Sequence, residues 1–322
     1  MTAGTQEADR LGIAPNGRAP RWLRFIFIAN LVAQIGIVVT GGIVRLTGSG
    51  LGCPTWPECV EGSYVPTARQ EEAWHKYVEF GNRLLTFVLA ALAIAAIVGA
   101  LAWWRRQRRV GEARGAVLAL AAIPIVGTAV QAVLGGITVL TGLNPWAVAA
   151  HFLVSMAIIA GCVMLVVRSG EPGDEPVERT VRPEVRWLAR VLLAVTAVVV
   201  VLGVIVTGSG PHSGDADTEA RFGVDPRTVA WLHADSVLLF LGLLIGLIVA
   251  LRVTQAPPRC MKAAVTLLGV ALAQGLVGYL QYFTGLPWVL VAVHMLGACL
   301  VWMLAVFVLA STRRRGGVPV SA

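Results

Sequence analysis

The stretch QAVLGGITVLTGLNPWAVAAH, residues 131–151, decides the fold, because the chain repeats it. Residues 274–294, QGLVGYLQYFTGLPWVLVAVH, align with it without a gap. The glutamine, one glycine, the TGL triplet and the final histidine fall at equal offsets in the two copies. A match at one fixed spacing is typical of a duplicated structural unit. The pattern therefore predicts that His151 and His294 occupy equivalent places in two such units.

Two further matches extend the repeat in the same order along the chain. VTGGIVRLTGSG at 39–50 is similar to VLGVIVTGSG at 201–210, and EFGNRLLTFVLAAL at 79–92 is more loosely similar to AWLHADSVLLFLGL at 230–243. We therefore expect two copies of one unit. The last match places Asn82 in the first copy where the second copy has His233.

The composition predicts a membrane protein. Hydrophobic residues make up 57% of the 322 residues and charged residues only 14%, whereas soluble domains carry about 25% charged residues. A soluble single-core domain, a disordered chain and a disulfide-stapled small protein are thereby excluded. Eight apolar stretches each have about the 20 residues that cross a bilayer as a helix. They lie at roughly 22–44, 77–104, 116–140, 146–167, 187–207, 229–251, 263–283 and 287–310.

The repeat and the spans together predict an all-α integral membrane protein, in which eight transmembrane helices form two pseudo-symmetric four-helix bundles. An even number of spans in each copy makes the two copies parallel. The predicted parts are a disordered cytoplasmic tail at 1–20, a first bundle at 21–168, a linker at 169–186, a second bundle at 187–310 and a second tail at 311–322.

The basic residues predict the orientation of the spans. With the N-terminus inside, 20 of the 26 Lys and Arg residues fall on the inner side and 6 on the outer side. Basic residues concentrate in cytoplasmic loops, so we expect both termini in the cytoplasm of a bacterial cell membrane. The net charge of +8 then follows from topology, and no nucleic-acid partner is needed.

Three histidines, His151, His233 and His294, lie inside apolar spans at similar depth, about 7–12 Å below the outer surface. A neutral imidazole bonded to a neighbouring helix is one interpretation. Recurrence at one depth favours metal ligation instead. A zinc site is disfavoured because no cluster of cysteines or carboxylates accompanies these residues. Heme fits better, because imidazoles from facing helices can clamp a planar ring inside a bundle.

The two copies predict two unequal heme sites. His233 and His294 would give a six-coordinate iron suited to electron transfer. In the first copy His151 faces Asn82, and asparagine binds heme iron weakly, so that site would keep an open face for chemistry. His75 lies about two turns further out than Asn82 and is a poor substitute ligand.

Two kinds of charged residue lie near the predicted first site. Glu79 shares a helix face with Asn82 and His75. It could accept protons, or it could form an interfacial ion pair with Arg83 or Lys76. Arg45 and Arg83 could hold heme propionates, or they could be interfacial arginines that reach toward the headgroups.

Cys53 and Cys59 are the first and last residues of the segment CPTWPEC in the first outer loop. A disulfide between them agrees with an oxidising outer compartment. The short spacing would make a tight, exposed ring. Such a ring is either a loop staple or a labile, redox-active pair. Cys162, Cys260 and Cys299 lie in or near the spans and are expected to be inert.

Taken together, GGIVRLTGSGLGCPTWPEC, EFGNRLLT, QAVLGGITVLTGL with His151, VTGSGPHSGD, HADSVLLF and QGLVGYLQYFTGL with His294 resemble heme A synthase over all eight spans. The resemblance implies heme b on His233 and His294. It implies substrate heme O at His151, a catalytic role for Glu79 and an outer cysteine pair at Cys53 and Cys59. Many members carry histidine where this chain has Asn82.

The resemblance also implies the reaction. The C8 methyl group of heme O would be hydroxylated twice and then lose water, giving the formyl group of heme A. Implied partners are a heme O-producing farnesyltransferase, assembly of a heme A-containing cytochrome c oxidase, membrane lipid and an outside thiol–disulfide protein. Two other functions fit the residues: a di-heme b cytochrome that takes electrons from quinol, and a heme transporter.

Overall fold

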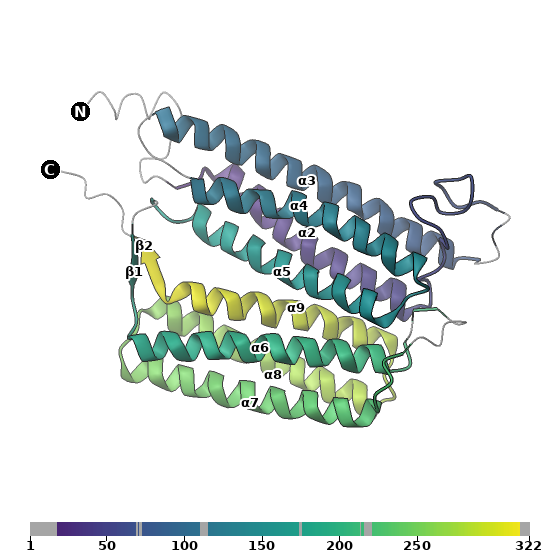
Figure 1. The fold of residues 1–322 in the computed structure, drawn as a ribbon. Coiled ribbons are helices and arrows are strands. Elements are labelled where there is room, and N and C mark those ends of the chain that lie inside the picture. Colours follow the sequence, from purple (N-terminus) through teal and green to yellow (C-terminus); the bar gives the residue numbers. More distant parts are fainter. Residues whose placement is uncertain are drawn as a thin grey trace.

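A computed structural model describes residues 18–68, 70, 73–109, 115–173, 176–212, 214–215 and 221–315, and long helices make up most of these residues (Figure 1). Eight helices within the described part are long and apolar enough to cross a membrane. They are α2 (Arg21–Leu46), α3 (His75–Arg109), α4 (Gly115–Leu140), α5 (Pro145–Ser169), α6 (Pro183–Ser209), α7 (Pro226–Val253), α8 (Pro258–Phe283) and α9 (Trp288–Ser311).

The helices form two four-helix bundles. In the first, α2 and α4 each pack against both α3 and α5, so that α3 and α5 face each other across a diagonal. In the second, α6 and α8 each pack against both α7 and α9, which places α7 and α9 on the equivalent diagonal. Figure 1 shows the two bundles stacked side by side. The predicted fold class is confirmed.

Helix starts follow local signals in the sequence. The side chains of Asn144 and Asp225 accept hydrogen bonds from the backbone of the first turns of α5 and α7, and a proline follows each. Helix α3 is longer than the predicted 77–104 span, because the backbone stays helical through the arginine-rich residues 105–109 beyond the apolar stretch.

Two short strands, β1 (Val177–Arg179) and β2 (Arg313–Arg315), were not expected from the sequence. They pair antiparallel, with Val177 opposite Arg315, and so join the predicted linker to residues just beyond α9. Three residues are too few to show an alternating pattern. The rest of the predicted tails, 1–17 and 316–322, lies outside the described residues, as do Arg10, Arg69 and Arg114 of the orientation count.

The two bundles share an apolar interface in which α9 packs against α2 and α5. Buried side chains such as Leu31, Ile159 and Cys299 belong to one cluster across it. The Trp302 indole N–H donates to the Met156 carbonyl across the same interface, at 2.8 Å. The halves are therefore joined by core packing as well as by the linker.

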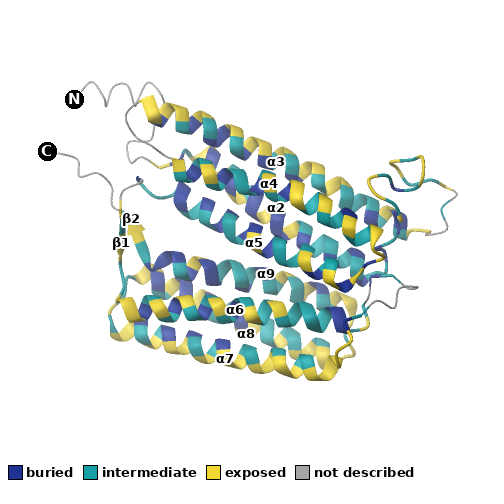
Figure 2. Ribbon diagram, in the orientation of Figure 1, coloured by how far each residue is buried: buried dark blue, intermediate teal, exposed yellow. Residues whose placement is uncertain are grey.

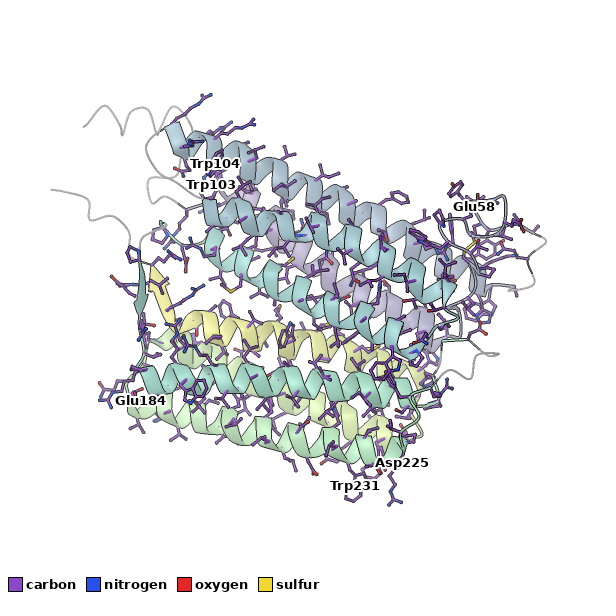
Figure 3. All side chains as sticks on the ribbon, viewed as in Figure 1. Glu58, Trp103, Trp104, Glu184, Asp225 and Trp231 are labelled. Atoms are coloured by element: carbon purple, nitrogen blue, oxygen red, sulfur yellow. A yellow bond between two sulfur atoms is a disulfide. The ribbon has the colours of Figure 1, made fainter. Side chains whose placement is uncertain are left out.

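The two ends of the molecule differ in what they carry. The described chain ends and the β1–β2 pair lie at one end, and the loops after α2 and α6 lie at the other (Figure 1). Glu58 and Asp225 mark the loop end, while Trp103, Trp104 and Glu184 lie toward the opposite end (Figure 3). Exposed residues run along the outward helix faces (Figure 2), as expected for helices that face lipid. Tryptophans near helix ends suit a membrane interface.

Candidate heme sites and the outer loop

Each of the four candidate ligand positions packs against a glycine on the preceding helix. A Cβ atom added at the glycine would lie 3.2–3.7 Å from the ligand side chain. The pairs are Gly41 with Asn82, Gly135 with His151, Gly203 with His233, and Gly278 with His294. The repeat therefore extends to the packing of the interior. In both bundles a glycine, which we call the notch glycine, leaves room for a polar side chain of the next helix.

The ring of His233 has an assignable tautomer. Its Nδ1 lies 3.1 Å from the Val199 carbonyl oxygen. A carbonyl oxygen only accepts, so Nδ1 carries the proton and Nε2 keeps the lone pair that a metal needs. This second-shell arrangement is typical of metal-binding histidines.

His151 and His294 share a different pair of features. In each ring Nδ1 is buried and has no hydrogen-bond partner among the described residues. The backbone carbonyl of each accepts a bond from a glutamine one helix earlier, Gln131 at 3.0 Å and Gln274 at 2.7 Å. A buried polar atom without a partner costs about 1–3 kcal/mol, and among the described residues both Nδ1 atoms are in that state.

Asn82 occupies the first bundle's equivalent of the His233 position. Its Oδ1 accepts a hydrogen bond from the Thr40 hydroxyl at 2.8 Å. The amide is therefore held against α2 beside Gly41 and fills the ligand position with a group that coordinates iron weakly.

These residues fit a heme in each bundle. Asn82 and His151 lie on the diagonal helices α3 and α5, and His233 and His294 on the diagonal helices α7 and α9. Ligands on opposite corners of a bundle can hold a planar ring between them. The histidine pair suits a tightly held heme, and the asparagine–histidine pair suits a more weakly ligated one.

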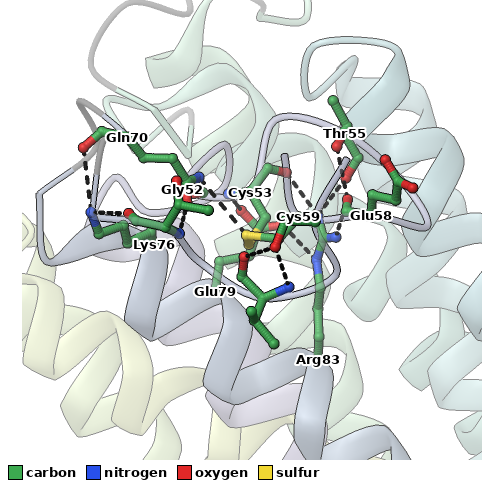
Figure 4. The surroundings of a disulfide bond; sticks show 12 residues. Gly52, Cys53, Thr55, Glu58, Cys59, Gln70, Lys76, Glu79 and Arg83 are labelled. Carbon is green, nitrogen blue, oxygen red and sulfur yellow. Dashed lines mark hydrogen bonds and ion pairs between the residues drawn. A yellow bond between two sulfur atoms is a disulfide. The ribbon is translucent and has the colours of Figure 1, made fainter. Parts of the chain in front are cut away.

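Glu79 is buried, with 5% of its surface exposed, beneath the disulfide loop that follows α2 (Figure 4). Its Oε2 accepts from the Cys53 backbone N–H at 2.7 Å, and its Oε1 pairs with Arg83 at 2.6 Å. The ion pair with Arg83, one of the two alternatives for this residue, is thus present in the structure. A catalytic role for Glu79 stays a prediction.

Arg83 and Lys76 anchor the same loop. Arg83 donates to the carbonyl oxygens of Cys53 and Thr55 at 2.7 and 3.0 Å, and Lys76 Nζ donates to that of Thr67 at 2.8 Å (Figure 4). Two cations about two turns apart on α3 therefore bind loop carbonyls. The guanidinium group of Arg83 already binds protein atoms. The propionate role expected for Arg83 stays a prediction.

The predicted disulfide between Cys53 and Cys59 is present. The ring is exposed at Pro54, Trp56 and Pro57, as expected, but the disulfide itself is buried, because the two cysteines are only 0% and 1% exposed. Glu79 and Arg83 lie beneath the ring, and the Gln70 amide lies within 3.8 Å of the Cys59 sulfur (Figure 4). The loop folds back onto α3, and the spacing of the cysteines gave no sign of that contact.

Arg45 joins the two bundles at the loop end. It donates to the carbonyl oxygens of His212 at 2.8 Å and Thr207 at 3.2 Å, both in the second half of the chain. Gly50 N–H also donates to the Gly214 carbonyl at 2.8 Å. Arg45 thus acts as a clamp between halves, and its propionate role stays a prediction.

The two histidines outside the ligand set point into loops. His75 Nδ1 lies 2.8 Å from the Ser49 hydroxyl, and the His75 ring stacks on Trp74. His212 Nε2 bonds the Leu286 carbonyl at 3.0 Å. These partners tie loops to helices.

Sequence reasoning missed the roles of the notch glycines and of Gln131 and Gln274. The equal offsets of the glutamines in the repeat were visible. The hydrogen bonds from these side chains to the ligand helices depend on helix packing, which the sequence does not display.

Comparison with known proteins adds the decisive observation. Residues 24–212 match the model of the cytochrome oxidase assembly protein family, which is more than half of the chain and extends from α2 through the end of α6. The chain belongs to this family.

Curated relatives point the same way. A heme A synthase of Alkalihalophilus pseudofirmus is 30% identical over 49% of this chain and 50% of its own length. One of Methylobacterium sp. is 30% identical over 62% and 60%, and one of Rhizobium johnstonii is 23% identical over 94% and 93%. The first of these matches covers about half of the relative. Family membership and eight apolar helices indicate a multi-pass membrane protein.

Proposed function

We propose that this chain oxidises the C8 methyl group of heme O to a formyl group, giving heme A. The observation that carries the proposal is the asymmetry between two otherwise equivalent notches. The second bundle presents His233 and His294, whereas the first presents His151 and an asparagine. A weakly ligated heme in the first bundle is the one that can react, which makes it the substrate.

The second bundle would hold a resident heme b. His233 and His294 would be its axial ligands, and the proton on Nδ1 of His233 directs Nε2 toward the iron. Such a heme supplies one-electron transfer when bound. The shared core between α5 and α9 keeps the two bundles at a fixed separation, as electron transfer between them requires.

In the first bundle, this chain's residues would bind the substrate and handle protons. His151 would bind the iron of heme O, and Asn82 would leave the opposite face accessible. Glu79 lies one helical turn from Asn82, at the loop end, where its carboxylate can accept a proton as the methyl group is hydroxylated. Two successive hydroxylations, each a two-electron oxidation by an external oxidant that also supplies the oxygen atom, would give a geminal diol, and loss of water would give the formyl group.

The proposal is tested by expressing the chain with a heme O-producing farnesyltransferase and extracting the hemes for chromatography. Heme A is expected from the intact chain, with heme b retained beside it. A His151→Ala variant is expected to keep heme b and to lose heme A. Heme b alone, from cells that contain heme O, would instead identify a di-heme cytochrome of the kind that accepts electrons from quinol.

The cellular setting forms part of the same proposal. We place both termini in the cytoplasm of a bacterial cell membrane, with the disulfide loop outside, on the strength of the uneven distribution of arginines. The farnesyltransferase would supply the substrate, and assembly of a heme A-containing cytochrome c oxidase would consume the product. An outside thiol–disulfide protein would reach Cys53 and Cys59 only after the loop opens, because both are buried.

A further inference from the structure

Arginines from separate segments line a cavity of about 370 Å³ at the end of the molecule that carries the β1–β2 pair (Figure 1). This end is opposite the disulfide loop, so the cavity is distinct from the candidate heme sites. Its lining consists of Arg18 before α2, Gly170, Glu171 and Pro172 after α5, Arg259 in the first turn of α8, and Arg314 and Arg315 in β2.

The cavity is cationic. Among the described residues that line it, four are arginines and one, Glu171, carries a carboxylate. This carboxylate forms an ion pair with the buried Arg168, and Arg315 Nε lies 3.6 Å from it. The negative charge is therefore already offset by neighbours. Guanidinium groups in such a setting bind phosphate oxygens through paired N–H donors.

Hydrogen bonds to the backbone hold the arginines in place. Arg259 donates to the Arg313 carbonyl at 2.7 Å and to the Thr180 hydroxyl at 3.2 Å. Arg314 lies opposite Glu178 in the β1–β2 pairing and forms an exposed ion pair with it, with Nη2 3.4 Å from Oε2. The cationic wall is thus attached to both the linker and the end of α9.

An apolar groove of about 150 Å³ lies on the same seam, where α5 packs against α9. Its lining is wholly apolar: Leu31 from α2, Val163, Val166 and Val167 from α5, and Met303, Leu304 and Phe307 from α9. Val166 precedes Gly170 of the cavity by four residues, about 6 Å along the helix. The groove therefore begins next to the cavity and extends deeper into the span.

We propose that this seam binds an anionic glycerophospholipid. Its phosphate would lie against Arg259 and Arg314, and one acyl chain would follow the groove past Val166 and Phe307. Basic pockets between transmembrane helices recognise anionic headgroups in this way. A free phosphate ion would use the cavity alone, whereas the adjoining groove calls for a ligand with an apolar chain.

The test uses full-length protein and native mass spectrometry in mixtures of phosphatidylglycerol and phosphatidylcholine. We expect selective retention of phosphatidylglycerol. The double variant Arg259→Gln/Arg314→Gln is expected to bind it about thirtyfold more weakly, because each basic residue near a membrane surface contributes about 1 kcal/mol. Arg108→Gln/Arg252→Gln removes two exposed arginines at the same end, outside the cavity, and is expected to change nothing.

Two further variants separate charge, groove and folding. Val166→Trp fills the groove without altering charge and is expected to weaken phosphatidylglycerol retention. Arg259→Lys/Arg314→Lys keeps the charge and should bind far better than the glutamine pair, which excludes misfolding as the cause. Equal loss in the Arg108/Arg252 control pair would overturn the proposal. So would full displacement by inorganic phosphate with no effect of Val166→Trp, which would identify a free phosphate site.

Discussion

Single residues set the geometry of the candidate heme sites, and the notch glycines are the clearest case. Gly278 and Gly275 lie on the same helix, within one turn of each other. A Cβ at Gly278 would lie 3.2 Å from His294 Cε1, whereas one at Gly275 would meet nothing within 4 Å. The two positions therefore separate the effect of displacing a ligand from the effect of adding a methyl group to a helix.

We expect Gly278→Ala to lower retention of heme b about tenfold, because overpacking of this kind costs about 1–3 kcal/mol. Gly275→Ala should retain heme as the parent does, because alanine favours the helix over glycine. Optical titration of purified protein with heme measures both. Equal retention by the two variants would remove the notch from the description of the site.

Asn82 sets the difference between the bundles, and Asn82→His should erase it. The new imidazole would face His151 across the α3–α5 diagonal, as His233 faces His294. We expect a second low-spin heme in the optical spectrum and a lower yield of heme A, because the open face of the substrate would be lost. A variant with an unchanged spectrum would show that this position does not reach the iron.

Glu79→Gln keeps the size of the side chain and removes its charge. If the carboxylate accepts a proton in the reaction, heme A formation should fall about a hundredfold or more. The matched variant Arg83→Lys keeps the cation beside Glu79 and should lose much less. Heme A per mole of protein, set against retained heme b, distinguishes a chemical defect from a folding defect.

At the scale of elements, the disulfide loop after α2 is held to α3 by the close approach of its backbone. A Cβ at Gly52 would lie 2.5 Å from the His75 carbonyl oxygen, and backbone cannot move aside as a flexible side chain can. Gly81, further along α3, has nothing within 4 Å. The close approach at Gly52 lies next to Cys53, whose N–H donates to Glu79.

We expect Gly52→Ala to lift the loop and expose the Cys53–Cys59 disulfide, at a cost of about 1–3 kcal/mol. Labelling with a thiol-reactive probe in the presence of a mild reductant should then become faster. Gly81→Ala should label as slowly as the parent. Slow labelling in both variants would indicate that burial of the disulfide does not depend on this contact.

The sequence predicted elements better than it predicted contacts between them. Eight spans, the duplication and the disulfide followed from hydrophobic length, fixed offsets and cysteine placement. The β1–β2 pair could not be predicted, because three arginine-rich residues carry no strand signal. The burial of Cys53 and Cys59 was missed for a related reason: it depends on Glu79 and Arg83 turning toward the loop.

At the scale of the whole molecule, the interface between the bundles joins the two candidate sites. In the apolar part of this interface, the Trp302 indole N–H donates a hydrogen bond to the Met156 carbonyl. Trp302→Phe keeps an aromatic ring and removes the indole donor, so that the Met156 carbonyl keeps only its hydrogen bond within α5. We expect a loss of about 0.5–1.5 kcal/mol, detected as a lower midpoint of thermal unfolding in detergent.

The matched control is Trp231→Phe, because Trp231 lies on α7 and is 60% exposed. Its midpoint should stay at the parent value. If the two variants unfold at the same temperature, the Trp302 contact adds nothing to the joining of the halves, and apolar packing alone accounts for it.

The β1–β2 ladder has a topological consequence. Because β1 before α6 pairs with β2 after α9, the two chain segments that flank the second bundle are hydrogen-bonded to each other. Cutting the chain between α5 and β1 would leave each fragment with all four of its helices and would leave the β1–β2 pairing intact. Two separately produced pieces therefore have what they need to reassemble into the working whole.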